Sequence, residues 1–460
     1  MSQTDFSTLN LHPALLKNLS TLGYKSMTPI QAQSLPLILQ GKDVIAQGQT
    51  GSGKTAAFGL GLLQKLNVKW FRIQSLILCP TRELADQVAK EIRKLGRSIH
   101  NIKVLTLCGG MPFGPQVGSL EHGAHIIVGT PGRIEDHLGK GTLKLDNVNL
   151  LILDEADRML EMGFQAALDA IIDQTPEQRQ TLMFSATFPE QIQVVAKRIM
   201  KQPKMVEAAS QHDNSTIQQH LFKANDNAHR MTVIRLILQQ YHPQSTVIFC
   251  NTKLETQEVA DKLSEYGFST LALHGDLEQR DRDQTLLRFS NKSVSVLVAT
   301  DVASRGLDIE SLDMVINYHI ARDIEVHTHR IGRTGRAGSS GMACTLYTEK
   351  EKFKLAKLEE YLGHSIAAEP LPSSNVLREP IDKPPMATLQ IDGGKKQKVR
   401  PGDILGALTG ENGITGQQVG KIQLFPNKAY VAVNRDVVQY ALRKLENGKI
   451  KGRSFRVRRT

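Results

Sequence analysis

Residues 48–55 read GQTGSGKT, a spacing that indicates phosphate-binding chemistry. The segment satisfies the pattern GxxxxGK[ST], follows an apolar run that predicts a strand, and leads into a helical pattern. Its glycines let backbone N–H groups surround phosphate oxygens, and the N-terminus of the following helix adds positive charge. We expect Lys54 to reach the β- and γ-phosphates of a nucleotide, and the Thr55 hydroxyl to ligate Mg²⁺. The predicted phosphate-binding residues are Gly48, Gln49, Thr50, Gly51, Ser52, Gly53, Lys54 and Thr55.

A second source of metal ligands lies at residues 154–157, which read Asp-Glu-Ala-Asp and follow the apolar run LLIL. A carboxylate at the C-terminal end of a buried parallel strand lies where α/β sheets place their ligands. We therefore expect Asp154 to hold Mg²⁺, directly or through water, and Glu155 to act as the base or orienting group for an attacking water. A solvated acidic turn is the alternative interpretation, which the glycine-rich loop disfavours.

Three arginines recur at intervals of three in residues 329–336, which read HRIGRTGR. Arg330, Arg333 and Arg336 would share one helical face or a tight turn. One interpretation is a surface salt-bridge cluster. The other is an arginine finger, in which the second half of the chain brings positive charge to a γ-phosphate held by the first half, worth ~10³–10⁵ in rate. Hydrolysis would then depend on closure of the two halves.

The elements that must position these residues are predicted by an alternation of short apolar runs and helical patterns between residues 43 and 347. This alternation is typical of a parallel sheet with helices on both faces. A polar stretch at residues 210–215 divides the series, so we predict two doubly wound α/β domains, residues 1–208 and 216–362. Residues 363–385 contain five prolines and predict an extended linker. Residues 386–460 follow the order βαββαβ, which predicts a small α+β domain.

The charge of the chain is concentrated in this last domain. The formal net charge is +11, and residues 386–460 account for +10 of it, with 15 Lys and Arg against 5 Asp and Glu. Such a strongly basic domain predicts an anionic partner, and nucleic acid is the usual one. The overall composition, 40% apolar and 22% charged, excludes wholesale disorder.

Several other classes of protein are disfavoured by the sequence. The four cysteines are far apart and form no CxxC, so neither a zinc site nor a disulfide framework is indicated. No apolar run approaches the ~18 residues of a membrane span. The polar N-terminus lacks the pattern of a secretory signal. We therefore expect a cytoplasmic protein without membrane contact.

With these motifs in order, residues 6–361 resemble the DEAD-box RNA helicases. The matching segments are GYKSMTPIQ at residues 23–31, PTREL at 80–84, TPGR at 130–133, SAT at 185–187, VIFCNT at 247–252, HGDLEQRDR at 274–282 and TDVASRGLD at 300–308. The resemblance implies two tandem RecA-like domains that close over ATP, Mg²⁺ and single-stranded RNA. It further implies that unwinding is local, because closure would bend one strand of a short duplex.

The resemblance also implies a role for each matching residue. Gln31 would read the adenine edge, with Phe6 and Tyr24 as aromatic support, and Asp308 would join the nucleotide interface. Arg333 and Arg336 would complete the catalytic set with Lys54 and Glu155. Contacts to the RNA backbone are implied for Thr81, Arg82, Gly109, Gly110, Thr130, Gly132, Arg133, Gln279, Arg282 and Thr300. Coupling between nucleotide and RNA is implied for Asp157, Ser185, Thr187 and His329.

Residues 386–460 resemble the tail of the DbpA-type subfamily, in which an RRM-like domain binds a hairpin of large-subunit ribosomal RNA. A run of stacking aromatics typical of RRM domains is absent, since the segment YVAV offers Tyr430 alone. We therefore expect basic side chains and loop backbone to dominate recognition, with a generic solvated basic face as the alternative. The predicted contacts are Lys395, Lys396, Lys398, Arg400, Tyr430, Lys449, Lys451 and Arg453.

Together these features predict a monomeric RNA-dependent ATPase that remodels ribosomal RNA during assembly of the large ribosomal subunit. An ATP-gated RNA clamp without productive unwinding is a rival hypothesis, because it needs the same motifs. The presence of Glu155, Arg333 and Arg336 favours turnover over permanent clamping. A DNA translocase is disfavoured, through the resemblance, by the segment around Gln31 and by the Asp-Glu-Ala-Asp run.

Overall fold

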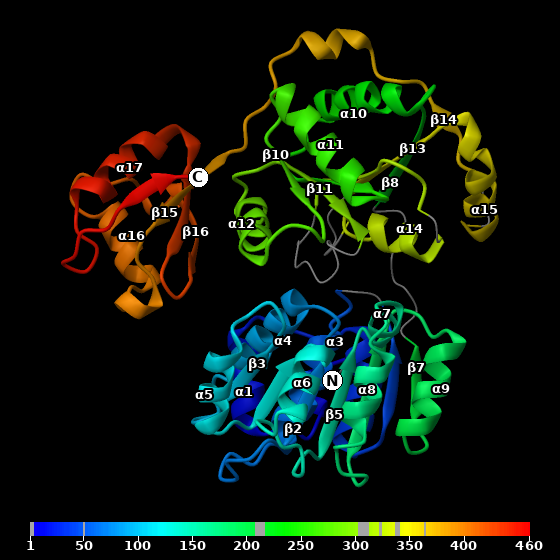
Figure 1. The fold of residues 1–460 in the computed structure, drawn as a ribbon, viewed down its shortest axis with the longest axis vertical. Coiled ribbons are helices and arrows are strands. Elements are labelled where there is room, and N and C mark those ends of the chain that lie inside the picture. Colours follow the sequence, from blue (N-terminus) through cyan, green and yellow to red (C-terminus); the bar gives the residue numbers. More distant parts are fainter. Residues whose placement is uncertain are drawn as a thin grey trace. The chain divides into compact units, whose positions relative to one another are not determined.

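The computed structural model describes residues 4–48, 51–207, 217–301, 312–321, 324–335, 341–362 and 365–460. The chain divides near residue 213 into two compact units. The first unit contains lobe 1 (residues 4–207). The second contains lobe 2 (residues 217–362), a proline-rich strap (residues 365–385) and the tail (residues 386–460) (Figure 1).

Lobe 1 is built on a seven-stranded parallel sheet with the strand order β3-β4-β2-β5-β6-β1-β7. Its strands are β1 (Val44–Gln47), β2 (Ser75–Leu78), β3 (Val104–Leu107), β4 (Ile126–Gly129), β5 (Leu150–Asp154), β6 (Gln180–Ser185) and β7 (Lys204–Glu207). Strands β2, β4, β5 and β6 are buried along their whole length. Continuous apolar runs form such strands because helices cover both faces of the sheet.

The helices of lobe 1 form two layers. A short 3₁₀ turn, η1 (Phe6–Thr8), precedes α1 (Pro13–Thr21), α2 (Pro29–Leu39), α3 (Lys54–Lys65), α4 (Arg82–Leu95), α5 (Phe113–Glu121), α6 (Pro131–Gly139), α7 (Ala156–Glu161), α8 (Gln165–Ile172) and α9 (Glu190–Ile199). Side chains that alternate along a strand enter different cores. On β5, Ile152 packs in the core with Phe58 of α3, whereas Leu151 packs in the core with Met159 of α7.

Lobe 2 repeats this architecture with a second seven-stranded parallel sheet of order β10-β11-β9-β12-β13-β8-β14. Its strands are β8 (Ile217–Lys223), β9 (Thr246–Cys250), β10 (Thr270–Leu273), β11 (Val296–Thr300), β12 (Met314–Asn317), β13 (Gly341–Tyr347) and β14 (Ala368–Glu369). Its helices are α10 (Asn227–Tyr241), α11 (Lys253–Glu265), α12 (Gln279–Ser290), α14 (Ile324–Ile331), η3 (Glu349–Glu351) and α15 (Lys352–Leu362). The prediction of two doubly wound α/β domains is thus confirmed.

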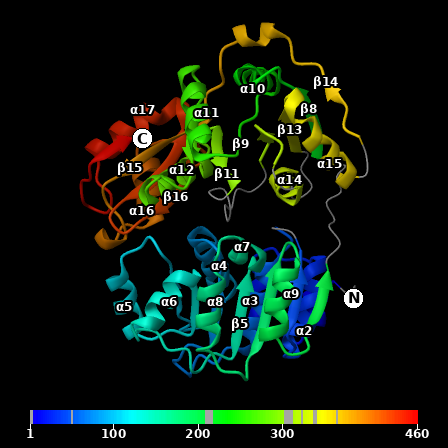
Figure 2. The same cartoon turned by 45° about the vertical axis from the view of Figure 1, so that its right-hand side comes forward.

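The strap passes over lobe 2 between α15 and the tail (Figure 1, Figure 2) and contacts lobe 2 at several points. Its strand β14 pairs with β8, and its 3₁₀ turn η4 (Ser374–Arg378) follows. The Gln239 side chain donates a hydrogen bond to the Glu379 carbonyl (2.9 Å). Leu371 and Ile381 pack against the apolar core of lobe 2. The proline content of this segment indicated a linker and did not reveal these contacts.

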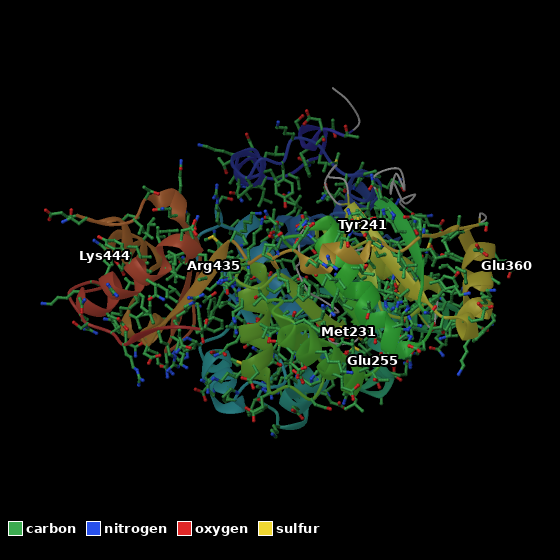
Figure 3. The ribbon with its side chains drawn as sticks, turned by 90° about the horizontal axis from the view of Figure 1, so that it is seen from above. Met231, Tyr241, Glu255, Glu360, Arg435 and Lys444 are labelled. Carbon is green, nitrogen blue, oxygen red and sulfur yellow. The ribbon has the colours of Figure 1, made fainter. Side chains whose placement is uncertain are left out.

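The tail is a four-stranded antiparallel sheet of order β16-β17-β15-β18 with helices on one face. It comprises β15 (Met386–Ile391), η5 (Lys395–Gln397), α16 (Pro401–Thr409), η6 (Gly416–Gln418), β16 (Val419–Leu424), β17 (Ala429–Asn434), η7 (Arg435–Val437), α17 (Val438–Asn447) and β18 (Val457–Arg459). Leu389 and Val431 pack beneath the two helices. Arg435, labelled in Figure 3, donates to the carbonyls of Pro384 and Met386 and so fixes the start of the domain. The predicted order βαββαβ is confirmed.

The other face of the tail sheet contacts lobe 2 through polar side chains. The Asn291 amide donates to the Thr388 hydroxyl, and that hydroxyl donates to Ser293 Oγ, both at 2.8 Å. The Gln284 amide donates to the Tyr430 hydroxyl at 3.0 Å. Thr388 and Tyr430 are buried as a result. Helix α12 and the residues after it therefore cover this face.

Two further features bear on the class of protein. Within the described ranges, no helix is long and apolar enough to cross a membrane. The four cysteines are buried and form no disulfide. Burial raises the pKa of the Cys108 thiol to about 12, so this thiol stays protonated at neutral pH.

Candidate functional site

The motif segments of lobe 1 that follow its strands gather at one edge of the sheet, because the C-terminal ends of parallel strands share that edge. The segments that follow β3, β4 and β2 are those predicted to contact RNA. The segments that follow β5 and β1 are those predicted to contact the nucleotide, and the segment that follows β6 is predicted to couple the nucleotide to RNA. Strand order therefore places the two sets side by side on the edge where α/β sheets bind ligands.

The glycine-rich loop joins β1 to α3, and its backbone conformation requires glycine. Gly51 and Gly53 have φ angles of 88° and 93°, in the left-handed region that glycine adopts without strain. A Cβ atom on Gly53 would lie 2.4 Å from Gln31 Nε2, so no larger residue fits there. Gln49 and Thr50 lie outside the described residues.

Lys54 and Asp154 bring opposite charges together at the base of this loop. Lys54 begins α3, is 6% exposed, and donates from Nζ to the Gly48 carbonyl at 2.6 Å. Asp154 ends β5 and is 3% exposed. Burial raises the pKa of Asp154 to about 7, the charge of Glu155 adds to this effect, and the charge of Lys54 opposes it. A cation near Asp154 would favour its ionised form.

The side chains at this position fit Mg²⁺. Thr55 offers a hydroxyl in the first turn of α3, and Asp154 offers a buried carboxylate at the end of β5. Mg²⁺ prefers hard oxygen donors, keeps several waters, and takes only one or two carboxylates from the protein. This donor set is therefore suited to Mg²⁺ and unsuited to metals that prefer sulfur or imidazole.

Glu155 sits at a strained turn between β5 and α7. Its φ angle is 53°, a left-handed conformation that costs a non-glycine residue about 1–3 kcal/mol. The residue is buried, and one of its carboxylate oxygens lies 3.7 Å from Arg158 Nε. Such strain persists only where the surrounding structure imposes it, and it is common at active sites.

The Asp-Glu-Ala-Asp and SAT segments are cross-linked through Asp157. Its Oδ2 accepts hydrogen bonds from the backbone N–H and the hydroxyl of Thr187 (both 3.0 Å) and from the Ala186 N–H (3.2 Å). Burial alone would raise the pKa of Asp157, but hydrogen bonds from Thr187 and Ser185 and the charges of Lys54 and Arg158 together outweigh it and lower the pKa. The Gly48 N–H donates to the Ser185 carbonyl at 2.9 Å. The end of β6 therefore contacts both nucleotide segments.

Gln31 is bound to the glycine-rich loop. Its amide donates to the Gly53 carbonyl (3.0 Å) and its amide oxygen accepts from the Thr28 N–H (2.9 Å). The Thr28 hydroxyl donates to the Ser52 carbonyl at 2.7 Å. The predicted adenine-reading segment is therefore part of the same local structure as the phosphate loop.

The two aromatic residues predicted to support adenine lie together inside lobe 1. Phe6 is buried and packs edge-on against Tyr24, with 6.1 Å between ring centroids. The Tyr24 hydroxyl donates to Glu91 at 2.7 Å. Phe6 and Tyr24, which are 18 positions apart in the sequence, are therefore in contact in the structure.

The predicted RNA segments of lobe 1 place backbone N–H groups and small residues at the surface. Thr81 caps the N-terminus of α4, and Thr130 precedes α6. The Thr130 hydroxyl accepts from the Gly109 N–H at 3.3 Å, which joins two of the segments. A Cβ atom on Gly109 or Gly132 would meet nothing within 4 Å, so the surface is open there. Arg82 lies beside Thr81, and Arg133 donates to the Met111 carbonyl at 2.9 Å.

In lobe 2, the predicted RNA residues come from two neighbouring strand ends. Helix α12, which follows β10, begins at Gln279 and carries Arg282 in its first turn. Thr300 ends β11, the strand next to β10, and is buried. The Gln279 amide donates to Asp283 on the same helix at 2.9 Å.

The arginines of residues 329–336 do not share one environment. Arg330 is 2% exposed and forms a two-pronged ion pair with Asp301 at 2.6 and 2.7 Å. The surface salt-bridge interpretation is therefore wrong for Arg330, which is bound inside lobe 2 and cannot reach a phosphate. Arg333 follows α14 and is buried. Arg336, Asp308 and the side chain of His329 lie outside the described residues.

The network around Arg330 contains residues that sequence reasoning missed. Its partners Asp301 and Asn317 follow or end different strands, and no spacing in the sequence links them. The one signal in the sequence for such a cluster was that these residues come at the C-terminal ends of predicted parallel strands, which meet at the same edge of a sheet.

The basic residues predicted to bind RNA in the tail lie on two adjoining loops. The Lys451 ammonium donates to the Lys398 carbonyl at 3.1 Å, which joins residues 395–400 to residues 449–453. All seven basic residues are exposed, and we call them the basic loop pair: Lys395, Lys396, Lys398, Arg400, Lys449, Lys451 and Arg453. Tyr430 lies apart from them, on the sheet face that contacts lobe 2.

Comparisons with known proteins agree with this arrangement. Residues 28–195 match the DEAD/DEAH box helicase family, residues 228–338 the helicase conserved C-terminal domain, and residues 388–459 the DbpA RNA binding domain. The chain is 53% identical to the ATP-dependent RNA helicase DbpA of Escherichia coli (strain K12), over 99% of both chains. It is 35% identical to the DbpA of Bacillus subtilis (strain 168), over 98% of both chains.

Solved structures of RNA-bound proteins share the fold of the two lobes. S. cerevisiae Dbp5 bound to RNA and ADP BeF3 matches with a TM-score of 0.73 and 31% identity, over 81% of this chain and 96% of that one. Mss116p bound to ssRNA and AMP-PNP matches with a TM-score of 0.71 and 27% identity, over 80% and 78%. The full-length likeness to the DbpA relatives, together with all three family matches, shows that this chain belongs to the DbpA-type DEAD-box ATP-dependent RNA helicases.

Proposed function

We propose that this helicase remodels large-subunit ribosomal RNA during assembly of the large ribosomal subunit, directed to an RNA hairpin by its tail. It acts as a monomer in the cytoplasm. The observation that carries the proposal is the single edge of the lobe 1 sheet, where the segments after β3, β4 and β2 adjoin those after β5, β6 and β1. Contacts of Asp157 and Ser185 connect the three segments after β5, β6 and β1 to one another.

The nucleotide half of this edge holds ATP with Mg²⁺. Lys54, which donates to the Gly48 carbonyl, would donate instead to the β- and γ-phosphates. Thr55 and Asp154 would hold Mg²⁺, which when bound neutralises charge on the phosphate oxygens. Glu155 orients the attacking water. The strain at Glu155 and the burial of both carboxylates support these roles.

The γ-phosphate receives its remaining positive charge from lobe 2. Arg333 and Arg336 supply guanidinium groups when the lobes close, and Asp308 joins the same interface. The position of Arg333 directly after α14, a helix fixed through Arg330, supports this role. ATP turnover then requires closure of the two lobes. Turnover distinguishes this enzyme from a clamp that stays bound to RNA.

The RNA half of the edge grips the sugar-phosphate backbone. Helix N-termini at Thr81 and Thr130, and the N–H groups of Gly109 and Gly110, are suited to phosphate because they carry partial positive charge. Gln279, Arg282 and Thr300 continue the track on lobe 2. Closure bends one strand and so opens a short duplex.

The tail gives the enzyme its preference for one RNA. Two exposed loops that together carry seven basic residues form a compact surface for phosphate and hairpin contacts. Residues 388–459 match the DbpA RNA binding domain, and the relatives named DbpA match this chain over their full length, which supports RNA binding by the tail.

A panel of RNAs tests the proposal. We expect a large-subunit ribosomal RNA fragment to give the highest ATPase rate at limiting concentration, above length-matched random RNA. Replacing Lys395, Lys396 and Lys451 with alanine should raise the RNA concentration needed for half-maximal activity and leave the rate at saturating RNA unchanged. Lys421→Ala, at an exposed lysine of β16, is the matched control. Equal stimulation by every RNA would contradict the proposal.

A further inference from the structure

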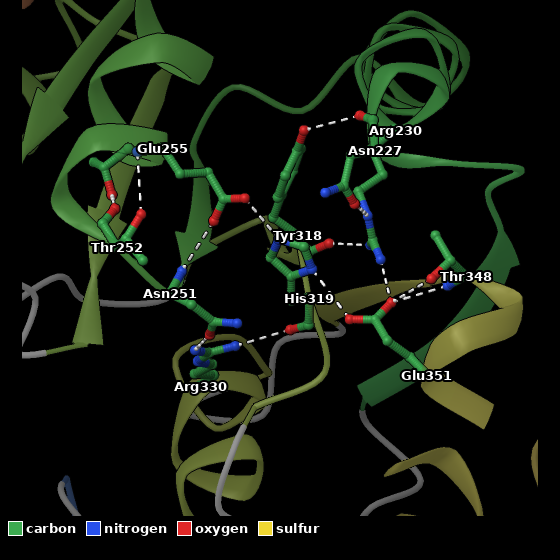
Figure 4. Close-up of polar contacts among 11 residues, drawn as sticks. Asn227, Arg230, Asn251, Thr252, Glu255, Tyr318, His319, Arg330, Thr348 and Glu351 are labelled. Carbon is green, nitrogen blue, oxygen red and sulfur yellow. Dashed lines mark hydrogen bonds and ion pairs between the residues drawn. The ribbon is translucent and has the colours of Figure 1, made fainter. Parts of the chain in front are cut away.

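A network of charged side chains lies at the C-terminal ends of three neighbouring strands of lobe 2, β11, β9 and β12 (Figure 4). Arg330 of α14 is its centre. Besides its ion pair with Asp301, Arg330 donates to the side-chain oxygens of Asn251 and Asn317 (both 3.3 Å). It also donates to the His319 carbonyl at 3.1 Å. One guanidinium therefore ties α14 to all three strand ends.

The imidazole of His319 lies between two carboxylates. Its Nε2 is 2.6 Å from Glu255 Oε1, and its Nδ1 is 3.1 Å from Glu351 Oε1. A neutral imidazole has only one N–H, so it would turn a lone pair towards one of these carboxylates. With both carboxylates ionised, both contacts are hydrogen bonds only when the ring carries two protons. The geometry therefore favours an imidazolium.

Both carboxylates are held in place by other groups. Glu255, on α11, accepts the Asn251 N–H at 3.3 Å through its second oxygen. Glu351, on η3, accepts the Thr348 N–H at 2.9 Å and pairs with the buried Arg230 of α10. His319 thus joins two fixed points that flank the loop after β12.

The same residue controls the loop through its backbone. The His319 carbonyl accepts a hydrogen bond from Arg330, and the preceding carbonyl, that of Tyr318, accepts one from Arg230. A shift of the imidazole would move the carbonyl that helps to hold Arg330. Arg330 in turn fixes α14, and Arg333 follows the end of this helix.

We propose that His319 is a positioning residue for ATP hydrolysis, because its imidazolium bridges Glu255 and Glu351 and so fixes the carbonyl that holds Arg330. Through Arg330, the bridge holds the end of α14 in the place that Arg333 needs. The inference rests on the proposed role of Arg333 at the γ-phosphate. His319 touches no substrate and acts only through its neighbours.

The electrostatics of the network agree with a charged imidazole. Burial alone would lower the pKa of His319, but hydrogen bonds with Glu255 and Glu351 outweigh it and raise the pKa above the ordinary value of 6.5. Burial would raise the pKa of Glu351, whereas bonds from His319 and Thr348 bring it down to about 2. The other charged or titratable groups around the bridge are Arg230, Cys250, Glu258, Asp301, Tyr318 and Arg330.

These neighbours fix the sign of the pH dependence. Burial raises the pKa of Cys250 and of Tyr318, so both stay neutral near pH 7. Three cations (Arg230, His319, Arg330) then face three carboxylates (Glu255, Glu351, Asp301). Because the pKa of His319 is raised, its bridge is complete at low pH and is lost as pH rises through that value. Turnover should therefore fall on the alkaline side.

The test compares pH profiles of RNA-stimulated ATPase activity for four full-length proteins: the parent, His319→Gln, Glu255→Gln and Glu265→Gln. Glu265 is an exposed residue at the end of the same helix and serves as the matched control. The kcat and the KM for ATP are measured at saturating RNA from about pH 6 to pH 9. Ring signals of His319, identified by their loss in His319→Gln, are titrated by NMR, and circular dichroism checks the fold.

We expect a single alkaline step in the kcat of the parent and of Glu265→Gln, at the pH where the His319 ring titrates. Glu255→Gln should move this step to lower pH. His319→Gln should abolish it and lower kcat roughly tenfold near pH 7, with little change in the KM for ATP. A purely structural role would lower activity without moving or removing the step.

The inference is overturned if the alkaline step survives in His319→Gln or stays at the same pH in Glu255→Gln. If His319→Gln does not fold, the Glu255→Gln profile decides alone. Arg333→Ala separates this result from the proposed function. Unchanged kcat in Arg333→Ala would refute the role of that guanidinium, whereas a step that moves in Glu255→Gln would still show that the bridge controls hydrolysis.

Discussion

Lys54, Asp154 and Asp157 show how single residues of lobe 1 carry buried charge. A buried charge is costly unless it is paired or hydrogen-bonded. Asp157 is satisfied by Thr187 and Ala186, and its pKa is lowered. Asp154 instead has its pKa raised to about 7 by burial, so its ionised form depends on nearby cations. Asp157 therefore cross-links two segments of lobe 1, whereas the role that we propose for Asp154 is to bind a cation.

Lys54→Ala should abolish ATP turnover, with a loss on the order of 10³-fold, because the phosphates lose a fixed cation and Asp154 loses the neighbour that favours its ionisation. Steady-state ATPase assays with saturating RNA measure the loss. Lys17→Ala, an exposed lysine on α1, should match the parent. Retained turnover in Lys54→Ala would refute the assignment of the loop.

Glu155→Gln should bind ATP but hydrolyse it at least 100-fold more slowly, because the amide keeps the shape of the side chain but orients water poorly. The measurement is single-turnover hydrolysis, with ATP retention on filters as the binding readout. Glu161→Gln, at the other end of α7, is the control. Single-turnover hydrolysis at the parental rate would exclude Glu155 from this role and favour another orienting group.

At the scale of elements, the position of the site follows from strand order. Helices between strands carry the chain back, so every strand of lobe 1 ends at the same edge. The conformation of the glycine-rich loop then sets the exact position of the predicted phosphate-binding groups. The left-handed glycines at 51 and 53 let the chain turn tightly into α3, and the contact of Gln31 with Gly53 fixes the loop from the side.

Gly53→Ala should weaken ATP binding by tenfold or more, because its left-handed backbone costs an L-residue on the order of 1–2 kcal/mol and the new methyl group would clash with Gln31. Titration with a fluorescent ATP analogue gives the Kd. Gly139→Ala is the matched control, since a Cβ atom there meets nothing within 4 Å. Equal affinity in both variants would show that the loop tolerates a side chain.

Elements with a strong pattern were predictable from the sequence, and those formed by tertiary context were not. Residues 75–78 and 150–154 are continuous apolar runs and form β2 and β5 as predicted. Strand β8 mixes polar and apolar residues, and β7 is an exposed edge strand, so neither has a clear pattern. The attachment of the strap to lobe 2 depends on pairing with β8, which no local signal reports.

The candidate site divides in the same way. Lys54 and Asp154 were predictable because phosphate and metal chemistry impose residue types at fixed spacing. Arg330 was grouped with two other arginines by spacing alone, whereas its environment is set by Asp301, 29 residues earlier in the chain. The bridge at His319 joins three separate elements and has no motif. Long-range pairing of charges is visible only in three dimensions.

At the scale of the whole molecule, charge is segregated. Residues 386–460 hold almost all of the net positive charge, and the basic loop pair gathers seven of these side chains. The two lobes are close to neutral, so we expect them to hold RNA through backbone N–H groups and a few arginines. We therefore expect RNA affinity from the tail and ATP-driven unwinding by the lobes to be separable properties.

Binding of the ribosomal RNA fragment should weaken steeply with salt, because each phosphate contact releases counterions. For about six contacts, affinity should fall by roughly 10³-fold between 50 and 200 mM salt. Fluorescence anisotropy without ATP gives the slope. Replacing Lys395, Lys396 and Lys451 with alanine should flatten it, and Lys421→Ala should change it by no more than a single contact. A flat slope in the parent would contradict phosphate-dominated binding by the tail.

The contacts between α12 and the tail sheet fix the distance between the tail and the predicted RNA-binding residues of lobe 2. Helix α12 carries Gln279 and Arg282 at its start and meets the tail through Gln284. From Gln279 to Gln284 the helix rises ~7.5 Å, five residues at 1.5 Å each. A hairpin anchored on the tail would thus lie at a set distance from the strand held by lobe 2. The enzyme would then select the base pairs it opens by their offset from the anchor, and RNAs with identical hairpins but shifted duplexes would be opened unequally.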